Sequence, residues 1–286
     1  MPPAGVLWYE RDREVRCARF TRRIAFFDRR GLPPSLESFV VKIRYLSLLL
    51  ANLLGLLLAT STWAADSLPI HPFKARYSGN VIVPLKPVDL SVKGTMELTL
   101  SDAGSGRYRL SNLISGVIGT INSEAEGEFL QDAIHPLRYE QTANTLKKSQ
   151  TRAVFNWQNK TIDAQENDEQ RTLQLTDGVV DPLSLYLLVM RNLQEGRKTP
   201  QYTLLSSIRL KTYLATTEGE ETLQTPLGKL RTLRISSHRD KPGSEGDITV
   251  LWFAPELGYL PVQMVRQEED KETLRMTIQE VQGGPR

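Results

Sequence analysis

The sequence predicts a mainly β protein: a strongly curved antiparallel sheet, forming a half-open barrel, with one buried α-helix. Most segments after Ala65 alternate apolar and polar residues with period two, which is typical of strands with one wet face. A single segment, residues 182–194, is instead apolar nearly all round and lacks a helix breaker. Because 40% of the residues are hydrophobic and no Pro, Gly or Ser-rich linker divides the chain, we expect residues 65–286 to form one domain.

The first strands are predicted before residue 115. Residues 73–77 and 81–83 indicate one strand that Pro84 closes. In residues 88–100 the even positions are nearly all apolar, which predicts a half-buried strand. The Gly and Ser-rich turn 101–106 then leads into a strand at 108–114, which completes a β-hairpin.

The middle of the chain continues this pattern up to the helix. Strands are predicted at 136–142, 152–157 and 161–164, and the acidic residues 166–169 are expected to form a solvated loop. Asp181 is a good helix N-cap, Pro182 suits the first helical position, and Gly196 stops the helix. We expect this helix to lie inside the curve of the sheet or across its open mouth.

The remaining strands follow the helix. They are predicted at 208–214, 230–237, 248–253, 261–266 and 273–281, with a hairpin turn at 225–228 and a charged turn at 268–271. Residues 248–253 are apolar on both faces, which indicates a central strand.

The segment before this domain predicts export. Residues 41–64 contain a basic head (Lys42, Arg44), a leucine-rich apolar stretch and a small-residue exit, the three parts of a secretory signal peptide. We place cleavage between Ala64 and Ala65, which makes the mature protein periplasmic. The alternative is an uncleaved inner-membrane anchor, although the apolar stretch is shorter than the roughly 20 residues that a span needs.

Residues 1–40 are Arg-rich and precede the place where a signal peptide normally begins. We interpret them as an upstream extension that is not native protein, with translation starting at Val40 or Val41, or else as a disordered basic tail. Cys17, the only cysteine, lies in this region, so residues 65–286 contain no thiol for a disulfide, a metal or a lipid.

The charge distribution argues against a nucleic-acid partner. Residues 1–64 hold 10 of the 36 Lys and Arg residues and 5 of the 33 Asp and Glu residues, which leaves 26 basic and 28 acidic residues from Ala65 onward. A slightly acidic domain without an aromatic-rich basic patch releases few counterions from nucleic acid.

Sequence motifs for catalysis, metal or cofactor binding are absent. There is no G-x-S-x-G turn and no phosphate-binding glycine loop, and His71, His135 and His238 lie far apart in the sequence. We therefore expect no catalytic residues, no metal site and no cofactor. Asp181 and Ser184 are sufficiently explained by helix capping.

Candidate binding residues are large or apolar side chains that could line a cavity: Trp157, Leu185, Tyr186, Val189 and Trp252. The alternative is that they fill the core. A basic run on residues 229–241, including Arg231, Arg234 and Arg239, could face an anionic lipid headgroup or glycan, or could be the wet face of an edge strand.

Several short motifs, in this order, resemble a bacterial family known as domain of unknown function 3108. They are Pro136-Leu137-Arg138-Tyr139-Glu140, Phe155-Asn156-Trp157, Asp181-Pro182-Leu183-Ser184-Leu185, Thr225-Pro226-Leu227-Gly228 with Thr232-Leu233-Arg234-Ile235, and Leu251-Trp252-Phe253 with Leu260-Pro261-Val262. Asn156 departs from the aspartate expected in the family. The resemblance implies an exported envelope protein without an established activity.

We expect a non-enzymatic periplasmic module that binds or carries an apolar or lipid-like envelope molecule. Two alternatives remain. The first is a scaffold that docks an envelope protein through a strand edge or near Arg231 and Arg234. The second is an unrecognised hydrolase of an envelope polymer.

Export is tested by N-terminal sequencing of the protein recovered from the periplasm. The expected first residue is Ala65, because signal peptidase cuts where the first and third residues before the cut are small, here Ala64 and Thr62. An intact precursor dissolved in the cytosol would contradict the prediction.

Overall fold

A computed structural model describes residues 68–85, 88–131, 133–269 and 271–284. By internal contacts the chain divides between Trp63 and Ala64, and every described residue belongs to the second unit. The proposed extension (1–40), the signal segment (41–64) and the cleavage site at Ala64 and Ala65 lie outside the described residues.

One sheet contains all fifteen strands of the described residues, in the order β8-β7-β6-β5-β4-β3-β2-β1-β15-β14-β13-β12-β11-β10-β9. The strands are β1 (Phe73–Leu85), β2 (Val88–Gly104), β3 (Arg107–Gly116), β4 (Gly119–Phe129), β5 (Ile134–Asn144), β6 (Ser149–Asn156), β7 (Thr161–Glu166), β8 (Glu169–Gln174), β9 (Val179–Val180), β10 (Gln201–Ser206), β11 (Arg209–Thr225), β12 (Gly228–Arg239), β13 (Ile248–Ala254), β14 (Leu260–Glu268) and β15 (Lys271–Gly283). The helices within the described ranges are α2 (Ser184–Gln194) and the 3-10 turn η1 (Pro255–Leu257).

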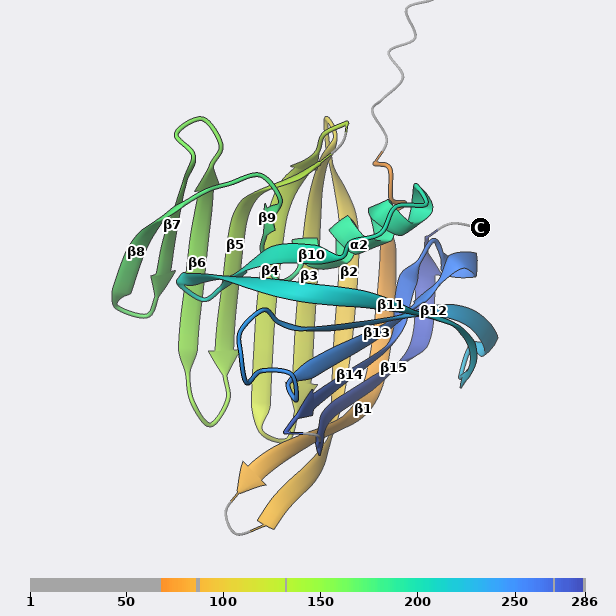
Figure 1. Ribbon diagram of the computed structural model, residues 1–286. Coiled ribbons are helices and arrows are strands. Elements are labelled where there is room, and N and C mark those ends of the chain that lie inside the picture. The colour runs from red at the N-terminus through yellow and green to blue at the C-terminus, as the bar shows by residue number, and fades with distance from the viewer. Residues whose placement is uncertain (1–67, 86–87, 132, 270, 285–286) are drawn as a thin grey trace, which may run out of the picture. The chain divides into compact units, whose positions relative to one another are not determined.

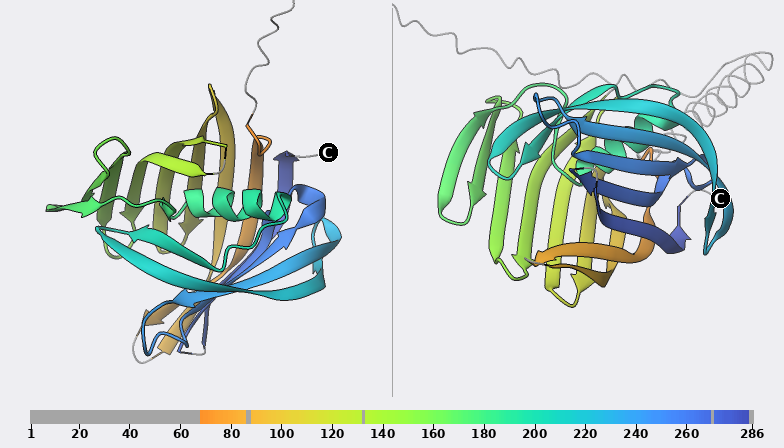
Figure 2. Two further views of the ribbon diagram at one scale, coloured as in Figure 1. Left: turned by 45° about the horizontal axis from the view of Figure 1, so that its top comes forward. Right: turned by 60° about the horizontal axis from the view of Figure 1, so that its bottom comes forward.

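The sheet is curved and open, which confirms the predicted fold class. Neighbouring strands are antiparallel except β9 and β10, which run parallel, and the sheet has two free edges, at β8 and β9. Strands β1–β8 form one wall, and β10–β15 fold over in front of it (Figure 1). Helix α2 lies between the two walls (Figure 2), as predicted from its apolar surface.

Alternation explains the strands that were predicted correctly, and its absence explains the ones that were missed. In β2, Met96, Leu98 and Leu100 point inward and are buried, while the residues between them face outward. The inward residues of β4 are Ser123, Ala125 and Gly127, which are too small and polar to give a hydrophobic period. Strands β8, β9 and β10 were missed as well, and the expected turn at 101–106 is shorter because β2 continues to Gly104.

Gly127 leaves no room for a side chain on the inward face of β4. A Cβ atom at Gly127 would lie 2.3 Å from the Tyr108 hydroxyl and 2.6 Å from the His135 carbonyl oxygen. The pairing of β4 with β5 shifts register between Glu126 and Gly127. A shift of this kind bends a strand locally. The absence of a side chain at Gly127 leaves space for the Tyr108 ring.

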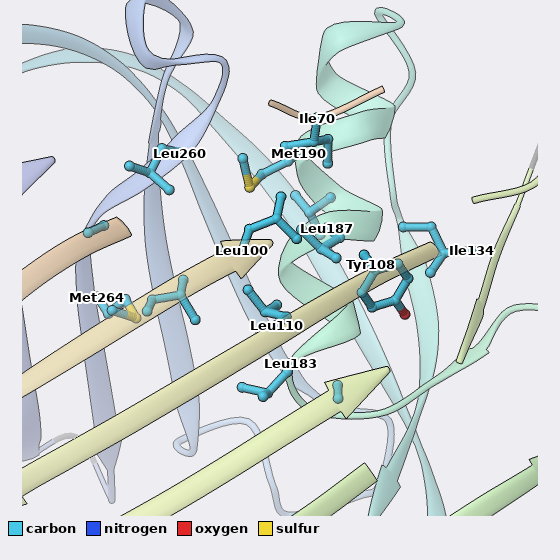
Figure 3. Packing of buried hydrophobic residues seen from close by; sticks show 14 of the residues in the cluster. Ile70, Leu100, Tyr108, Leu110, Ile134, Leu183, Leu187, Met190, Leu260 and Met264 are labelled. Carbon is cyan, nitrogen blue, oxygen red and sulfur yellow. The ribbon is translucent and has the colours of Figure 1, made fainter. Parts of the chain in front are cut away.

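The core forms around α2. Leu187 and Met190 of the helix, with Leu183 just before it, pack against side chains from both walls (Figure 3). Leu100, Tyr108, Leu110 and Ile134 come from the β1–β8 wall, and Leu260 and Met264 come from β14. The helix therefore supplies the apolar filling that holds two parts of one curved sheet together.

The start of α2 depends on Asp181. Regular helix begins at Ser184, but the Asp181 carboxylate accepts the backbone N–H groups of Leu183 and Ser184 at 2.8 and 2.9 Å. These bonds satisfy N–H groups that have no partner inside the helix, so the predicted N-cap role is confirmed. At the other end Gly196, with φ of 69°, donates to Leu193 and Arg197 donates to Asn192, which closes the helix.

Asp181 also ties the helix to β3. Ser184 donates its hydroxyl to the Asp181 carboxylate, and the hydroxyl oxygens of Tyr108 and Ser184 lie 2.6 Å apart. Because the Ser184 proton is directed at Asp181, Tyr108 is the donor in the second bond. Burial raises the pKa of the Asp181 carboxyl, while the hydrogen bonds from Ser184 and Leu183 oppose that increase.

Arg191 anchors the last turn of the helix to the loop between β4 and β5. Its guanidinium donates to the carbonyl oxygens of Leu130 and Ala133 at 2.6 and 3.0 Å, and also to that of Gln131. The Nε atom lies 3.0 Å from the Glu195 carboxylate. A buried arginine thus satisfies three loop carbonyls at once, which a planar fork of donors can do.

Replacing Asp181→Ala removes the helix cap and leaves Ser184 without its acceptor. We expect the free energy of unfolding to fall by about 2–3 kcal/mol, measured by urea denaturation. The matched control is Asp177→Ala, whose side chain is 91% exposed, and it is expected to change the value by less than about 0.5 kcal/mol. Equal losses in the two variants would contradict the proposed role.

The substitution Arg191→Lys keeps the positive charge, but the lysine ammonium cannot reach all three loop carbonyls. We expect a loss of about 2–4 kcal/mol in the free energy of unfolding, because buried acceptors lose charged donors. Arg231→Lys, on a 60% exposed side chain, serves as the control and is expected to be nearly neutral. A near-neutral result for Arg191→Lys would show that the loop is held by other contacts.

Candidate functional site

An open groove of about 890 Å³ lies where several hairpins of the two walls end. It is bounded by the ends of β1 and β2, the β3–β4 turn and the β14–β15 hairpin, with Thr145 and Asp247 at its margins. These hairpin ends lie below the helix in Figure 1. The groove therefore opens at the end of the curve that α2 does not occupy.

The wall of the groove is aliphatic. Its inward-facing members are related by strand pairing: Val81 lies opposite both Val92 and Leu274, and Ile114 lies opposite Ile121. All five side chains are half-buried, whereas the residues deeper on the same strands are buried beneath the helix. The wall is thus a continuation of the core surface that no other part of the described chain covers completely.

The size of the helix accounts for this uncovered surface. Strands β1 and β2 have 13 and 17 residues, so at about 3.3 Å per residue they extend for roughly 40–55 Å. Helix α2 lies across these strands (Figure 2), and a helix with its side chains is only about 10–12 Å wide. One helix can therefore cover only part of the concave face.

The rim of the groove is charged. Carboxylates and basic side chains both contribute, namely Asp89, Asp247, Glu268, Glu269, Glu272, Lys93, Arg266 and Lys271. Arg266 lies 2.8 Å from Glu268, and the Glu272 carboxylate pairs with Arg275 at 2.5 Å. The groove is therefore amphipathic, with an apolar wall inside and ionic groups where it meets water.

The sequence-predicted binding residues lie elsewhere in the core. Leu185, Tyr186 and Val189 come together on α2, where the Tyr186 hydroxyl donates to the Met264 sulfur at 3.4 Å. Burial raises the pKa of Tyr186 to about 12. None of the three lines the groove, and their role in ligand binding stays a prediction.

The two tryptophans are placed apart from this group and from each other. Trp157 donates its indole N–H to the Pro136 carbonyl at 2.8 Å and stacks on His135 with ring centroids 3.6 Å apart. Trp252, on β13, donates to the Glu221 carboxylate and lies beneath the Arg234 guanidinium. Neither ring lines the groove, so for both residues a ligand role likewise stays a prediction.

Sequence reasoning missed the groove because its residues come from strand ends that are distant in the chain. The available signal was weak: aliphatic residues such as Ile82 and Ile118 persist up to the turns, where polar residues are usual. Only the curvature of the sheet brings the two sets of ends together.

Two further properties of the described residues bear on the site. Among them, no three or more His, Cys, Asp or Glu side chains are arranged to hold a metal ion. No helix in the described part of the chain is long and apolar enough to cross a bilayer.

The fold is similar to that of a known structure. The crystal structure of a beta-barrel-like protein of domain of unknown function DUF1849 from Brucella abortus matches with a TM-score of 0.54 and 11% sequence identity. The match covers 76% of this chain and 99% of that chain. At this identity the similarity concerns the fold alone, and it agrees with the curved, barrel-like sheet.

Two comparisons concern the sequence itself. A comparison with curated proteins finds no match. A family model described as protein of unknown function (DUF3108) matches residues 91–279, a range that contains every motif on which the resemblance was based. The chain therefore belongs to the DUF3108 family.

Proposed function

We propose that this protein is an exported, periplasmic, non-enzymatic module that binds or carries an apolar or lipid-like molecule of the cell envelope. The observation that carries the proposal is the open groove with its aliphatic wall. Its volume of about 890 Å³ falls within the roughly 300–1,000 Å³ typical of small-molecule sites.

Hydrophobic burial supplies the driving force for binding. The half-buried side chains Val92, Ile114, Ile121 and Leu274 leave apolar surface in contact with water. A ligand that covers such a surface gains about 25 cal/mol for each Å² removed from water. An extended hydrocarbon chain suits this site because the wall offers aliphatic contact along several strands.

The Asp181-Pro182-Leu183-Ser184 motif supports a structural role rather than a chemical one. Asp181 and Ser184 are fully buried, and their polar groups are engaged in capping the helix and in the contact with Tyr108. A serine nucleophile needs access to its substrate. This family motif therefore positions the helix, and through the helix it determines how much of the concave face stays open.

A protein-docking scaffold is the second candidate, and the free edge of the sheet at β8 is the observation that favours it. An exposed edge can accept a strand from a partner. On β8, however, Arg171 pairs with Glu169, and charged side chains commonly protect edges from pairing. Arg231 and Arg234, also considered for docking, face Glu220 and Glu218 at 4.0 and 3.0 Å.

Native mass spectrometry of the protein purified from its cells separates the two candidates. A bound species with the mass of a lipid supports the carrier, and a stoichiometric polypeptide supports the scaffold. Protein that arrives without a small molecule and binds no apolar probe afterwards would overturn the carrier proposal.

Groove variants provide the quantitative test. We expect Ile114→Gln and Leu274→Gln each to weaken binding of the neutral fluorescent probe N-phenyl-1-naphthylamine about tenfold or more, because each places an amide in the apolar wall; tenfold corresponds to about 1.4 kcal/mol. The control is Leu113→Gln, the neighbouring residue, which is 44% exposed and faces away from the groove. Equal affinities in all three variants would place the probe elsewhere.

A further inference from the structure

The concave face of the β10–β15 wall carries a cluster of basic side chains. Strand pairing defines which residues share this face: Arg266 lies opposite Leu274 of the groove wall and opposite Thr249, and Thr249 lies opposite Ser237. Arg239 is two positions beyond Ser237 on the same face, and it lies opposite Tyr213 of β11. Lys211 and Arg209 are two and four positions before Tyr213 on β11, so their side chains share its face. We name Arg209, Lys211, Arg239 and Arg266 the concave basic cluster.

The orientation of this face is established by its contacts with the helix. Met264, which accepts the hydrogen bond from Tyr186 of α2, is two residues before Arg266 on β14 and points the same way. Tyr202 of β10 lies opposite Tyr213 and reaches across to donate to the Ser237 hydroxyl at 3.0 Å. The basic cluster therefore faces the interior of the curve.

Most of the cluster is not neutralised within the described residues. Arg266 pairs with Glu268 at 2.8 Å, but no described carboxylate lies within ion-pair distance of Arg209, Lys211 or Arg239. The convex face of the other wall is different, since Arg76, Arg109 and Arg138 each pair there with a glutamate. These three arginines are thus paired outside the curve, whereas Arg209, Lys211 and Arg239 have no ion pair among the described residues inside it.

The cations also act on one another. Partial burial lowers the pKa of the Lys211 ammonium, and the positive charges of Arg239, Arg209 and Arg266 lower it further. Like charges gathered on a concave, low-dielectric surface repel, and the same geometry focuses their field on an incoming anion. An anion bound there would relieve this repulsion.

The cluster and the groove meet at Arg266, the one cluster residue that lines the groove. Arg266 belongs to the cluster and also lines the groove, opposite Leu274 of the aliphatic wall. The acidic rim residues Glu268 and Glu269 lie beyond Arg266, towards the tip of the β14–β15 hairpin. Neutral hydroxyl groups lie on the same face as the cations. They belong to Ser237, Thr249 and the tyrosines Tyr202 and Tyr213, whose rings stack.

We propose that the ligand of this groove is an anionic amphiphile, whose acidic head group is bound by Arg209, Lys211, Arg239 and Arg266 while its hydrocarbon chain lies against the aliphatic wall. The inference rests on the proposed binding function and specifies the ligand class. Arginine and lysine form their strongest hydrogen bonds with carboxylate and phosphate groups, which are the head groups that this cluster fits.

Two probes with the same chain and different heads test the proposal. Isothermal titration calorimetry is performed with dodecanoate and with dodecanol. We expect dodecanoate to bind at least tenfold more tightly than dodecanol. Added salt is expected to weaken the binding of dodecanoate and to leave that of dodecanol unchanged, because salt screens the cluster. Equal affinities would overturn the charge inference and leave the apolar carrier standing, whereas failure of both probes to bind would overturn the proposed function as well.

The double variant Lys211→Gln with Arg239→Gln identifies the residues responsible. It is expected to weaken dodecanoate binding about tenfold or more and to leave dodecanol binding within about twofold, which also shows that the variant is folded. Lys229→Gln with Arg231→Gln, on the same strand as Arg239, removes equal charge outside the cluster and is expected to change neither affinity. Equal weakening of dodecanoate by the two double variants would overturn the assignment.

Dodecyl phosphate and inorganic phosphate distinguish an amphiphile from a free anion. Dodecyl phosphate is expected to bind at least as tightly as dodecanoate, because its head carries more charge and more acceptor oxygens. Inorganic phosphate is expected to bind far more weakly, since it lacks the chain. Equal binding of the two phosphates would show an anion site without a role for the groove and would overturn the proposal.

Discussion

Burial of one short helix inside a curved sheet is the constraint on which the rest of the structure depends. Helix α2 packs against both walls, and Leu68 and Ile70, which precede β1, join the same core. Polar contacts determine where the helix lies: Asp181 and Ser184 connect its start to Tyr108, and Arg191 connects its last turn to the β4–β5 loop. These bonds fix the position of the apolar filling along the strands.

The same arrangement produces the groove. Because the helix lies across the strands and is narrower than they are long, the concave face cannot be covered from end to end. The uncovered part carries aliphatic residues near the turns, where solvent-exposed strand ends would ordinarily be polar. Structure and proposed function thus share one origin, since the element that stabilises the sheet also defines the binding surface by leaving it open.

Charge is distributed between the two faces in opposite ways. On the convex face of the β1–β8 wall, arginines pair with glutamates of the same or a neighbouring strand. On the concave face of β11–β14, Arg266 pairs with Glu268, but Arg209, Lys211 and Arg239 have no ion pair within the described chain. A nearly neutral composition therefore conceals a local basic site, and net charge alone could not have revealed it.

Local patterns in the sequence determined the fold class, most of the strands, and the helix with its cap and its glycine stop, because these features depend on residues close together in the chain. The order of motifs identified the family. Strand β4 was beyond such reasoning, since its inward residues are Ser123, Ala125 and Gly127 and show no hydrophobic period.

The groove was also beyond sequence reasoning, as was the gathering of Arg209, Lys211, Arg239 and Arg266. Val92 and Leu274 are separated by most of the domain, and they share one wall only because β1 and β15 pair and the sheet curves. Period-two alternation indicates that a residue faces one side of a strand. The tertiary structure alone decides which side is concave, how far the helix covers it, and which charges meet there.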